Sequence, residues 1–336
     1  MNATMRYLTT TDLTIGYRQP TGQNILFERL NLSLSAGQMI CFMGPNGAGK
    51  SSLLRALAGL QKPLAGTIRI EGGGKTENIP TQVAVVLTDR IYGLNLTVEE
   101  IVAFGRYPYL GWNIRLSKED EEKIQAAIEQ IHLQPLLRKK LYQLSDGQLQ
   151  MTMIARALAQ DTPVILLDEP TAHLDLNNRV EIMDLLLKLT RDTGKAVLLA
   201  THELDLALQT ADLIWLTGKN RNILTGLPED LVLNGSFDEI FDLKGFDLKT
   251  GKVRHHPFRN VAIQLAGAGA EYLWTKNALE RNGFGIAHDQ QEISVTLTGD
   301  PLPLRWVIKR KDGVNEADSI ESLLKLLEQT IAARHP

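Results

Sequence analysis

The chain has 336 residues, of which 43% are hydrophobic and 22% are charged, and its formal net charge is -3. These values exclude a disordered or fibrous protein, and the length favours two domains, a large first one and a smaller second one. The near balance of 36 basic and 39 acidic side chains argues against a protein that coats nucleic acid, so no nucleic-acid partner is expected.

Signals for membrane insertion or export do not stand out in the sequence. No run of about 18 apolar residues predicts a membrane-spanning helix, and the N-terminus MNATMRYLTTTDLTIGY lacks the charged head and apolar centre of a secretory signal. The single cysteine, Cys41, lies in the apolar run GQMICFMG, where a buried structural thiol is expected. We therefore expect a cytoplasmic protein, whose role at any membrane is indirect.

The stretch GPNGAGKSS, residues 44–52, follows the strand-like run QMICFM and precedes SLLRALAGL, which has helical spacing. It matches G-x-x-x-x-G-K-[ST] at every fixed position, whereas an ordinary glycine-rich turn needs no such agreement. Its glycines let backbone N–H groups surround a phosphate at a helix N-terminus. We expect Lys50 to neutralise the β- and γ-phosphates and Ser51 to bind Mg²⁺. The predicted nucleotide-binding residues here are Gly44, Pro45, Asn46, Gly47, Ala48, Gly49, Lys50, Ser51 and Ser52.

Two later strands end in residues suited to hydrolysis. The apolar run PVILLDEP ends in Asp168, expected to hold Mg²⁺ through its water shell, and Glu169, expected to deprotonate the attacking water. Paired acids could also only cap the next turn. The run AVLLATHELDLA predicts another buried strand, with His202 directly after it. This histidine either forms hydrogen bonds with backbone groups or senses the γ-phosphate. The presence of the other motifs favours the role of γ-phosphate sensor.

The order of GPNGAGKSS, LSDGQ, VILLDEP, TAHLD and THE resembles the nucleotide-binding subunit of ABC transporters over residues 8–235. The resemblance implies an α/β, P-loop NTPase fold with a helical signature subdomain, which binds ATP and Mg²⁺ and hydrolyses ATP. In that family two such domains meet head to tail, and the signature helix of each completes the active site of the other. The resemblance therefore implies an ATP-dependent homodimer.

Further roles follow from the same resemblance. In LSDGQ, the hydroxyl of Ser145, the N–H of Gly147 and the side chain of Gln148 would contact the partner's γ-phosphate. Tyr17 in LTIGYRQ resembles the aromatic residue that stacks on adenine, although an aromatic side chain on an early strand is otherwise a core residue. Asp175 in TAHLD would lie across the dimer interface and link the two sites.

Two positions depart from the family pattern. Asp146 stands where the signature usually has glycine, and because aspartate is a good N-cap we expect it to start the helix with its carboxylate directed away from phosphate. Thr88 stands where the family has a glutamine that reaches Mg²⁺ and water. Threonine is shorter, so water, Asp89 or a looser coupling of hydrolysis to transport would compensate. Because Glu169 is present, we still expect hydrolysis.

The number of motifs in the chain indicates which kind of ABC protein it resembles. One P-loop, one signature and no long heptad region disfavour the tandem translation-type and the chromosome-organising ATPases, and favour separate permease chains. The segment LNLTVEEIVAFGRYPYLGW, residues 94–112, lies where the family receives the permease. Its aromatic residues Tyr107, Tyr109 and Trp112 could instead pack the helical subdomain, so we expect a mixed role.

The sequence TVEEIVAFGRYPY resembles the corresponding segment in ATPases of importers for ferric siderophores, haem and vitamin B12. This resemblance implies an external solute-binding protein and a peripheral position on the inner face of the cell membrane. An exporter ATPase and a soluble regulatory ABC switch are the alternatives.

From residue 236 the pattern changes. After the loop-rich stretch SFDEIFDLKGFDLKTGKVRHHPF, alternating strand and helix signals predict a small α+β domain over residues 236–336, with IKRKDG as a charged hairpin turn. Gly267 and Gly269 suggest a dinucleotide loop only weakly, because Tyr272 occupies the third glycine position. His255 and His256 lack a cluster of metal-ligating neighbours. The role of this domain stays open between stabilising the dimer and responding to a ligand.

Overall fold

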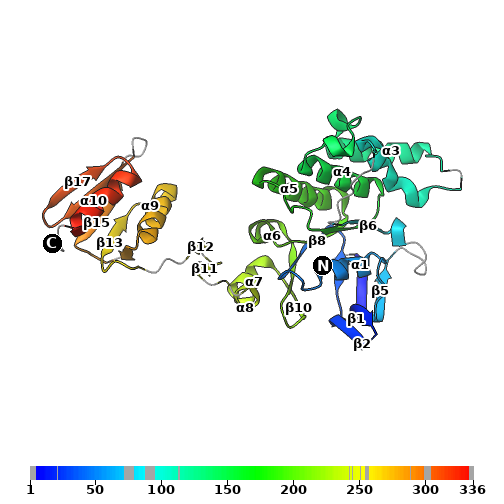
Figure 1. The fold of residues 1–336 in the computed structure, drawn as a ribbon, viewed down its shortest axis with the longest axis horizontal. Coiled ribbons are helices and arrows are strands. Elements are labelled where there is room, and N and C mark those ends of the chain that lie inside the picture. The colour runs from blue at the N-terminus through cyan, green and yellow to red at the C-terminus, as the bar shows by residue number, and fades with distance from the viewer. Residues whose placement is uncertain are drawn as a thin grey trace. The chain divides into compact units, whose positions relative to one another are not determined.

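The structure is a computed structural model that describes residues 5–20, 22–71, 79–87, 95–112, 114–241, 243, 245–249, 251–253, 257–287, 289–298 and 304–332. The chain divides into two compact units, Met1–Leu243 and Lys244–Pro336, which are described one at a time (Figure 1). Thr88, Asp89, His255 and His256 lie outside the described residues, so their predicted roles stay predictions.

A six-stranded sheet forms the centre of the first unit, in the order β10-β9-β4-β8-β7-β6. Neighbouring strands are parallel except for β10, which is antiparallel to β9. Every residue of β4, β7 and β8 is buried, as expected for parallel strands covered on both faces. The strands are β4 Met39–Met43, β6 Val83–Val86, β7 Val164–Asp168, β8 Ala196–Ala200, β9 Leu213–Thr217 and β10 Ile223–Gly226.

The two faces of this sheet are covered differently. On one face, Leu53, Leu54 and Leu57 of α1 (Lys50–Leu57) join sheet residues in one hydrophobic core, which also includes residues of an antiparallel sheet. The opposite face packs against α5 (Leu176–Thr193) and α6 (Leu204–Thr210) (Figure 1). The strand ends that carry the motifs are therefore held between two packed layers.

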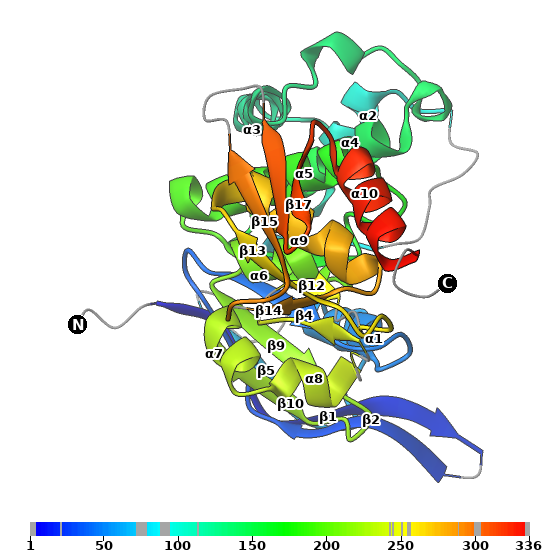
Figure 2. The ribbon, with the colours of Figure 1, turned by 90° about the vertical axis from the view of Figure 1, so that its left-hand side faces the viewer.

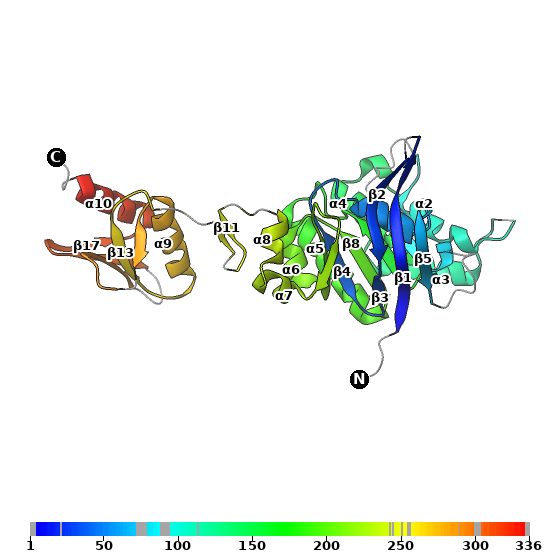
Figure 3. The same cartoon turned by 90° about the horizontal axis from the view of Figure 1, so that it is seen from below.

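The antiparallel sheet has the order β2-β1-β3, and β5 also pairs with β1 (Figure 3). In the pairing of β1 with β2, Tyr17 lies opposite Asn24. A Cβ atom on the neighbouring Gly16 would lie 2.2 Å from the Asn24 carbonyl oxygen, so this close approach requires glycine. The strands are β1 Arg6–Gln19, β2 Gly22–Leu30, β3 Ser33–Ser35 and β5 Ala65–Ile70.

The helices α2, α3 and α4 form a helical subdomain at the end of the first unit opposite to β1 and β2 (Figure 2). They span Val98–Ala103, Lys118–Gln130 and Asp146–Ala159, and a 3-10 helix, Phe104–Tyr109, continues α2. The helix α3 ends at Gln130. His132 takes a φ of 56° just past the end of α3, where the helix cannot continue.

The boundary between the units differs from the predicted one. We expected the second domain to begin at residue 236, in a loop-rich stretch. The structure instead has α7 (Pro228–Leu233) packed against α8 (Ser236–Phe241), with Phe237 fully buried, inside the first unit. The pair of aromatic residues, Phe237 and Phe241, stack with their ring centroids 6.1 Å apart, which anchors a helix that the sequence pattern did not reveal.

The second unit is a two-layer α+β domain, as predicted. Its five-stranded sheet has the order β14-β13-β15-β16-β17, and strand residues of one face share a core with Leu279 of α9 and Leu323 and Leu327 of α10. The charged turn IKRKDG joins β16 to β17, as expected of a hairpin. The elements are β11 Phe246–Asp247, β12 Lys252–Val253, β13 Ala262–Ala266, α9 Gly269–Arg281, β14 Gly285–Ala287, β15 Ile293–Thr298, β16 Arg305–Arg310, β17 Gly313–Ala317 and α10 Ile320–Ala332.

Among the residues that the structure describes, no helix combines the length and the apolar character that crossing a bilayer requires.

Candidate functional site

The loop between β4 and α1 depends on its glycines. Gly44 and Gly49 take φ values of 157° and 100°, which other residues rarely adopt. A Cβ atom on Gly44 would lie 2.5 Å from the Thr217 carbonyl oxygen, and one on Gly49 would lie 2.9 Å from the ring of Phe27. Gly49 is also the N-cap of α1, and in this described stretch no side chain caps the helix. The N-terminal N–H groups of α1 are thus available to an anion.

Lys50 is folded back into this loop. Its side chain is buried, and Nζ donates hydrogen bonds to the carbonyl oxygens of Gly44 at 2.8 Å and Pro45 at 3.3 Å. Burial lowers the pKa of Lys50, while the negative charges of Glu169 and Asp168 act in the opposite direction. The structure therefore brings an ammonium group and two carboxylates to one place, although they come from distant parts of the sequence.

Ser51 and Asp168 meet at the same edge of the sheet. Ser51 Oγ donates a hydrogen bond to Oδ1 of Asp168 at 3.0 Å, and Asp168 is buried at the end of β7. Both are hard oxygen donors, which Mg²⁺ prefers. The described residues contain no group of three or more histidine, cysteine or acidic side chains able to hold a metal alone. This small donor set fits Mg²⁺, which is usually bound through one or two protein oxygens together with water and phosphate.

Glu169 and His202 form a close pair. Nδ1 of His202 lies 2.6 Å from Oε2 of Glu169. The Glu169 side chain is 17% exposed and that of His202 is 54% exposed, so the pair lies at the opening of the site. The N–H of Glu169 donates to the carbonyl oxygen of Ala200 in β8, which fixes the backbone from which the carboxylate projects. A carboxylate held against an imidazole in this way can accept a proton from water.

Tyr17 lies beside the same loop. Its hydroxyl oxygen is 2.7 Å from Ser52 Oγ, and the side chain of Tyr17 is 44% exposed. The tyrosine is therefore not a core residue, which was the alternative to a stacking role. The hydrogen bond to Ser52 is a contact that sequence spacing could not reveal, because Tyr17 lies in β1 and Ser52 in α1, and only the fold brings them together.

The signature sequence begins α4, but its cap differs from the expectation. Ser145 is the N-cap: its Oγ accepts from the N–H of Gln148 at 3.3 Å, and Gln148 Oε1 accepts from the N–H of Ser145 at 3.3 Å. The prediction that Asp146 caps the helix was wrong. Asp146 is the first helical residue, and the motif S-x-x-Q starting at Ser145 is the capping-box signal that should have been used.

The signature lies close to Asn178 of α5, which bonds to Asp175 of the TAHLD motif. A Cβ atom on Gly147 would lie 3.0 Å from Cγ of Asn178. Asn178 in turn donates from its backbone N–H and its side-chain Nδ2 to the two carboxylate oxygens of Asp175, each at 2.9 Å. Asp175 is thereby the N-cap of α5. Asn178 was not predicted as a site residue, and no motif marks it.

The predicted site residues thus fall into two groups. Lys50, Ser51, Asp168, Glu169 and His202 gather at one edge of the central sheet. In the described part of the chain, the hydrogen bonds of Ser145 and Gln148 connect them to each other and to their own helix, and none reaches the loop 44–52. Among the described residues, Ser145 and Gln148 therefore make no hydrogen bond to the P-loop of their own chain.

Comparison with known proteins agrees with this arrangement. The family described as ABC transporter matches residues 27–172, and the family described as iron ABC transporter C-terminal domain matches residues 260–328. An uncharacterised ABC transporter ATP-binding protein of Methanocaldococcus jannaschii is 35% identical over 277 residues, 79% of this chain and 94% of the relative. The chain belongs to the ABC transporter ATP-binding proteins. As an ABC ATPase it binds and hydrolyses ATP, which confirms the predicted family, fold and enzyme class.

Other proteins similar to this ABC ATPase include importer subunits. The petrobactin import ATP-binding protein FpuD of Bacillus anthracis is 36% identical, over 70% of this chain and 87% of the relative. A metal-chelate type ABC transporter in an inward-facing conformation matches with a TM-score of 0.63 and 28% identity, over 71% of this chain and 90% of that chain. A dimeric bacterial ABC transporter cassette matches with a TM-score of 0.53 and 28% identity, over 62% and 93%.

Proposed function

We propose that this chain is the ATP-hydrolysing subunit of a membrane importer that takes up an iron chelate such as a ferric siderophore, with haem and cobalamin as neighbouring substrate classes. Similarity to a petrobactin import protein supports the iron chelate, and so does the match of the second unit to the iron ABC transporter C-terminal domain. The observation that carries the ATPase assignment is the convergence of Lys50, Ser51, Asp168, Glu169 and His202.

ATP binding would begin at the P-loop. The N–H groups of residues 44–52 and the N-terminus of α1 surround the phosphates, and Lys50 exchanges its bonds to the Gly44 and Pro45 carbonyl oxygens for bonds to the β- and γ-phosphates. Tyr17 offers its exposed ring to adenine. Ser51 and Asp168 would hold Mg²⁺, which neutralises charge on the phosphates.

Glu169 would then act as the base. Its carboxylate accepts a proton from the attacking water, whose oxygen bonds to the γ-phosphorus as the bond to the β–γ bridging oxygen breaks and ADP leaves with the electron pair. His202 contributes in two ways. Through Nδ1 it orients the Glu169 carboxylate, and its exposed side chain leaves Nε2 to contact a γ-phosphate oxygen. Removing either group should slow hydrolysis more than it weakens ATP binding.

The second half of each site would come from a second copy of the chain. In the described part of the chain, Ser145 and Gln148 at the N-terminus of α4 make no hydrogen bond to the loop 44–52, and a similar cassette is dimeric. We propose a head-to-tail homodimer, in which Ser145, Gly147 and Gln148 contact the partner's γ-phosphate. Asp175, which caps the adjacent α5, would lie at the interface and link the two sites.

The remaining partners follow from transport. Because no described helix can span a bilayer, separate permease subunits would form the pathway, and an external solute-binding protein would deliver the chelate. The chain would lie in the cytoplasm, on the inner face of the cell membrane. The exposed aromatic residues after α2, among them Tyr107 at 62% and Trp112 at 102% exposed, are the surface that we assign to the permease.

Uptake by the native cell tests this function. Deleting the gene should abolish uptake of radioactive iron supplied as a ferric siderophore, and the wild-type gene should restore it. Glu169→Gln should bind ATP normally but fail to restore uptake, because water is no longer activated. Iron uptake that is unchanged by the deletion, or that Glu169→Gln restores fully, would contradict the proposal.

A further inference from the structure

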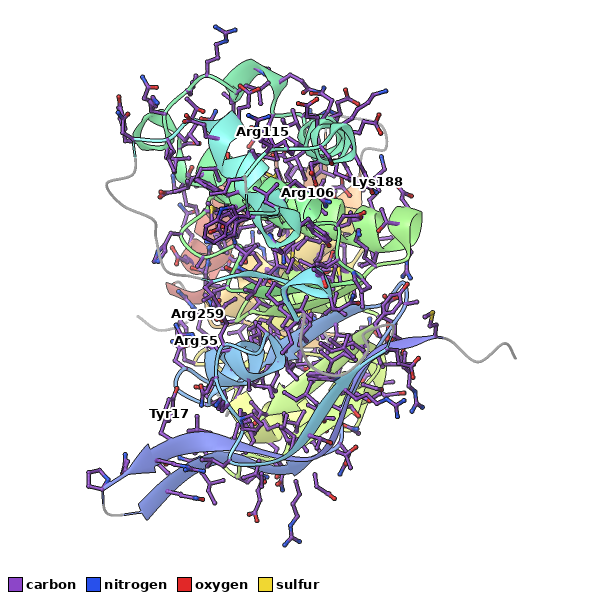
Figure 4. The ribbon with its side chains drawn as sticks, turned by 90° about the vertical axis from the view of Figure 1, so that its right-hand side faces the viewer. Tyr17, Arg55, Arg106, Arg115, Lys188 and Arg259 are labelled. Atoms are coloured by element: carbon purple, nitrogen blue, oxygen red, sulfur yellow. The ribbon has the colours of Figure 1, made fainter. Side chains whose placement is uncertain are left out.

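One buried arginine stands in an otherwise exposed aromatic segment. We call residues 104–112, sequence FGRYPYLGW, the aromatic segment. Phe104 is 50% exposed, Tyr107 62% and Trp112 102%, whereas Arg106 between them is only 5% exposed. Figure 4 shows Arg106 within the helical subdomain, well separated from Tyr17 near β1. Burying an arginine among exposed aromatic residues reverses the usual preference and requires a reason.

The guanidinium of Arg106 joins three elements. Nε donates to Oδ1 of Asp120 in α3 at 2.8 Å, and Nη1 donates to the carbonyl oxygen of Ala159, the last residue of α4, at 3.0 Å. The same group lies 3.9 Å from the centre of the Tyr109 ring. A planar guanidinium can donate in these two directions and stack at the same time, which a lysine ammonium cannot do.

The segment also lies directly on the backbone of α4. A Cβ atom on Gly105 would lie 2.3 Å from the carbonyl oxygen of Arg156, so glycine is required for this approach. Arg156 in turn donates from Nη2 to the carbonyl oxygen of Val85 in β6 at 2.8 Å. The end of α4 is thus attached on one side to the aromatic segment and on the other to the central sheet.

The contacts of Arg106 determine the position of the aromatic segment more than they add to the free energy of unfolding. A buried ion pair such as that of Arg106 and Asp120 can often be replaced by apolar residues of similar volume without loss of stability. Its directional hydrogen bonds, however, set the place of the segment relative to the helices that it joins. Because α4 is a rigid rod of about 21 Å, a displacement at Ala159 reaches the signature residues at its other end.

We propose that Arg106 is a positioning residue that locks the aromatic segment to the C-terminal end of α4, so that movement of the segment by a membrane partner shifts the signature residues. This proposal rests on the proposed function, in which the segment receives the permease and Ser145, Gly147 and Gln148 contact the partner's nucleotide. Coupling is reciprocal, so engagement of the signature by ATP must also change the aromatic segment. That reverse direction can be measured in the full chain alone.

Hydrogen exchange measures both ends of the coupling. In full-length Glu169→Gln, Mg-ATP should slow amide exchange at residues 145–149 and also, about 5-fold or more, at residues 105–109. Adding Arg106→Met should keep the first effect and abolish the second. Arg115→Met is the matched control, because Arg115 follows the segment but is exposed, and it should preserve both effects.

Two further variants separate position from stability. Arg106→Lys keeps the charge but not the two-directional donation, so the ATP effect at residues 105–109 should again be lost. The double variant Arg106→Met/Asp120→Asn removes both charges but keeps an amide oxygen that can accept from the N–H of Ser117. Its melting temperature should fall less than that of Arg106→Met alone, which leaves the Asp120 charge buried without Arg106, while the effect at residues 105–109 is still missing. Either variant gives the answer if Arg106→Met alone fails to fold.

The outcomes are distinct. If ATP fails to protect residues 145–149 in Glu169→Gln itself, the proposed ATP-dependent dimer is wrong. If ATP protects residues 145–149 and the Arg106 variants keep the wild-type change at residues 105–109, the dimer stands and the role of Arg106 is overturned.

Discussion

Single residues at the site are held in conformations that their neighbours impose. Glu169 has a φ of 51° and His173, four residues later, a φ of 65°, a region that non-glycine residues seldom occupy. Such positions cost about 1 kcal/mol or more each and cluster at functional sites. The bond from the Glu169 N–H to Ala200 and the contact with His202 hold this strained backbone in place. The carboxylate of Glu169, which we propose as the base, is therefore held in place without bound nucleotide.

The carboxyl group of Asp120 predicts how the stability of the fold depends on pH. Hydrogen bonds from the side chain and backbone of Ser117, together with the charge and hydrogen bond of Arg106, lower the pKa of Asp120 from 3.8 to about 2. Because the folded-state pKa is depressed, the stabilisation is fully present above about pH 4 and is lost as the pH falls from 3.8 towards 2.

The change that tests this is Asp120→Asn. Urea denaturation between pH 5 and pH 3 should show a smaller loss of stability in the variant than in the wild type, by about 1 kcal/mol. Asp146→Asn, which alters an exposed carboxyl group, is the control. An unchanged pH dependence in Asp120→Asn would show that the Asp120 carboxylate does not stabilise the fold.

Among the helices and strands, α4 connects the signature residues to the aromatic segment that follows α2. Its first turn carries the signature residues, and its last carbonyl oxygens contact Arg106 and the segment after α2. Gly147 packs against Asn178, so the start of α4 also rests on the start of α5. One helix therefore contacts the proposed permease surface, carries the proposed dimer-interface residues in its first turn, and packs against α5, whose N-cap Asp175 is proposed to link the two sites.

The cap of α4 supplies the second prediction. Ser145→Ala should lower the free energy of unfolding by about 1 kcal/mol, because the N–H of Gln148 loses its partner. Thr97→Ala removes the equivalent cap of α2, where the N–H of Glu100 donates over the same 3.3 Å, and should cost a similar amount. Only Ser145→Ala should also weaken ATP-driven association, measured by light scattering. Equal association in both variants would contradict a role of Ser145 at the partner's phosphate.

The sequence predicts a site residue when a local motif marks it, and misses one whose partners are distant in the sequence. Lys50, Ser51 and Asp168 were found because fixed spacing next to buried strands specifies their geometry. Asp146 was wrongly chosen as a cap because side-chain preference was weighed without the reciprocal bond of Ser145 and Gln148. Arg106 could not be found, because its partners lie 14 and 53 residues away in sequence and only the fold brings them together.

At the scale of the whole molecule, two units of different architecture share one chain. The first is the ABC cassette and extends to residue 243, eight residues beyond the predicted boundary at 235, because α8 packs on α7. The second pairs two helices with one face of a five-stranded sheet and matches a C-terminal domain of iron ABC transporters. The order of motifs was enough to predict the first fold, and the alternation of strand and helix signals predicted the second. The boundary depended on the stacked pair of Phe237 and Phe241, which no motif marks.

In the proposed function two chains close on ATP, and the signature of each chain completes the site of the other. The most direct test is the molar mass of full-length Glu169→Gln, measured by light scattering after size exclusion with and without Mg-ATP. Removing the base should preserve binding and trap the closed dimer, so the mass should rise from 37.3 kDa to about twice that value when ATP is added. A mass that ATP leaves unchanged would contradict the ATP-dependent dimer.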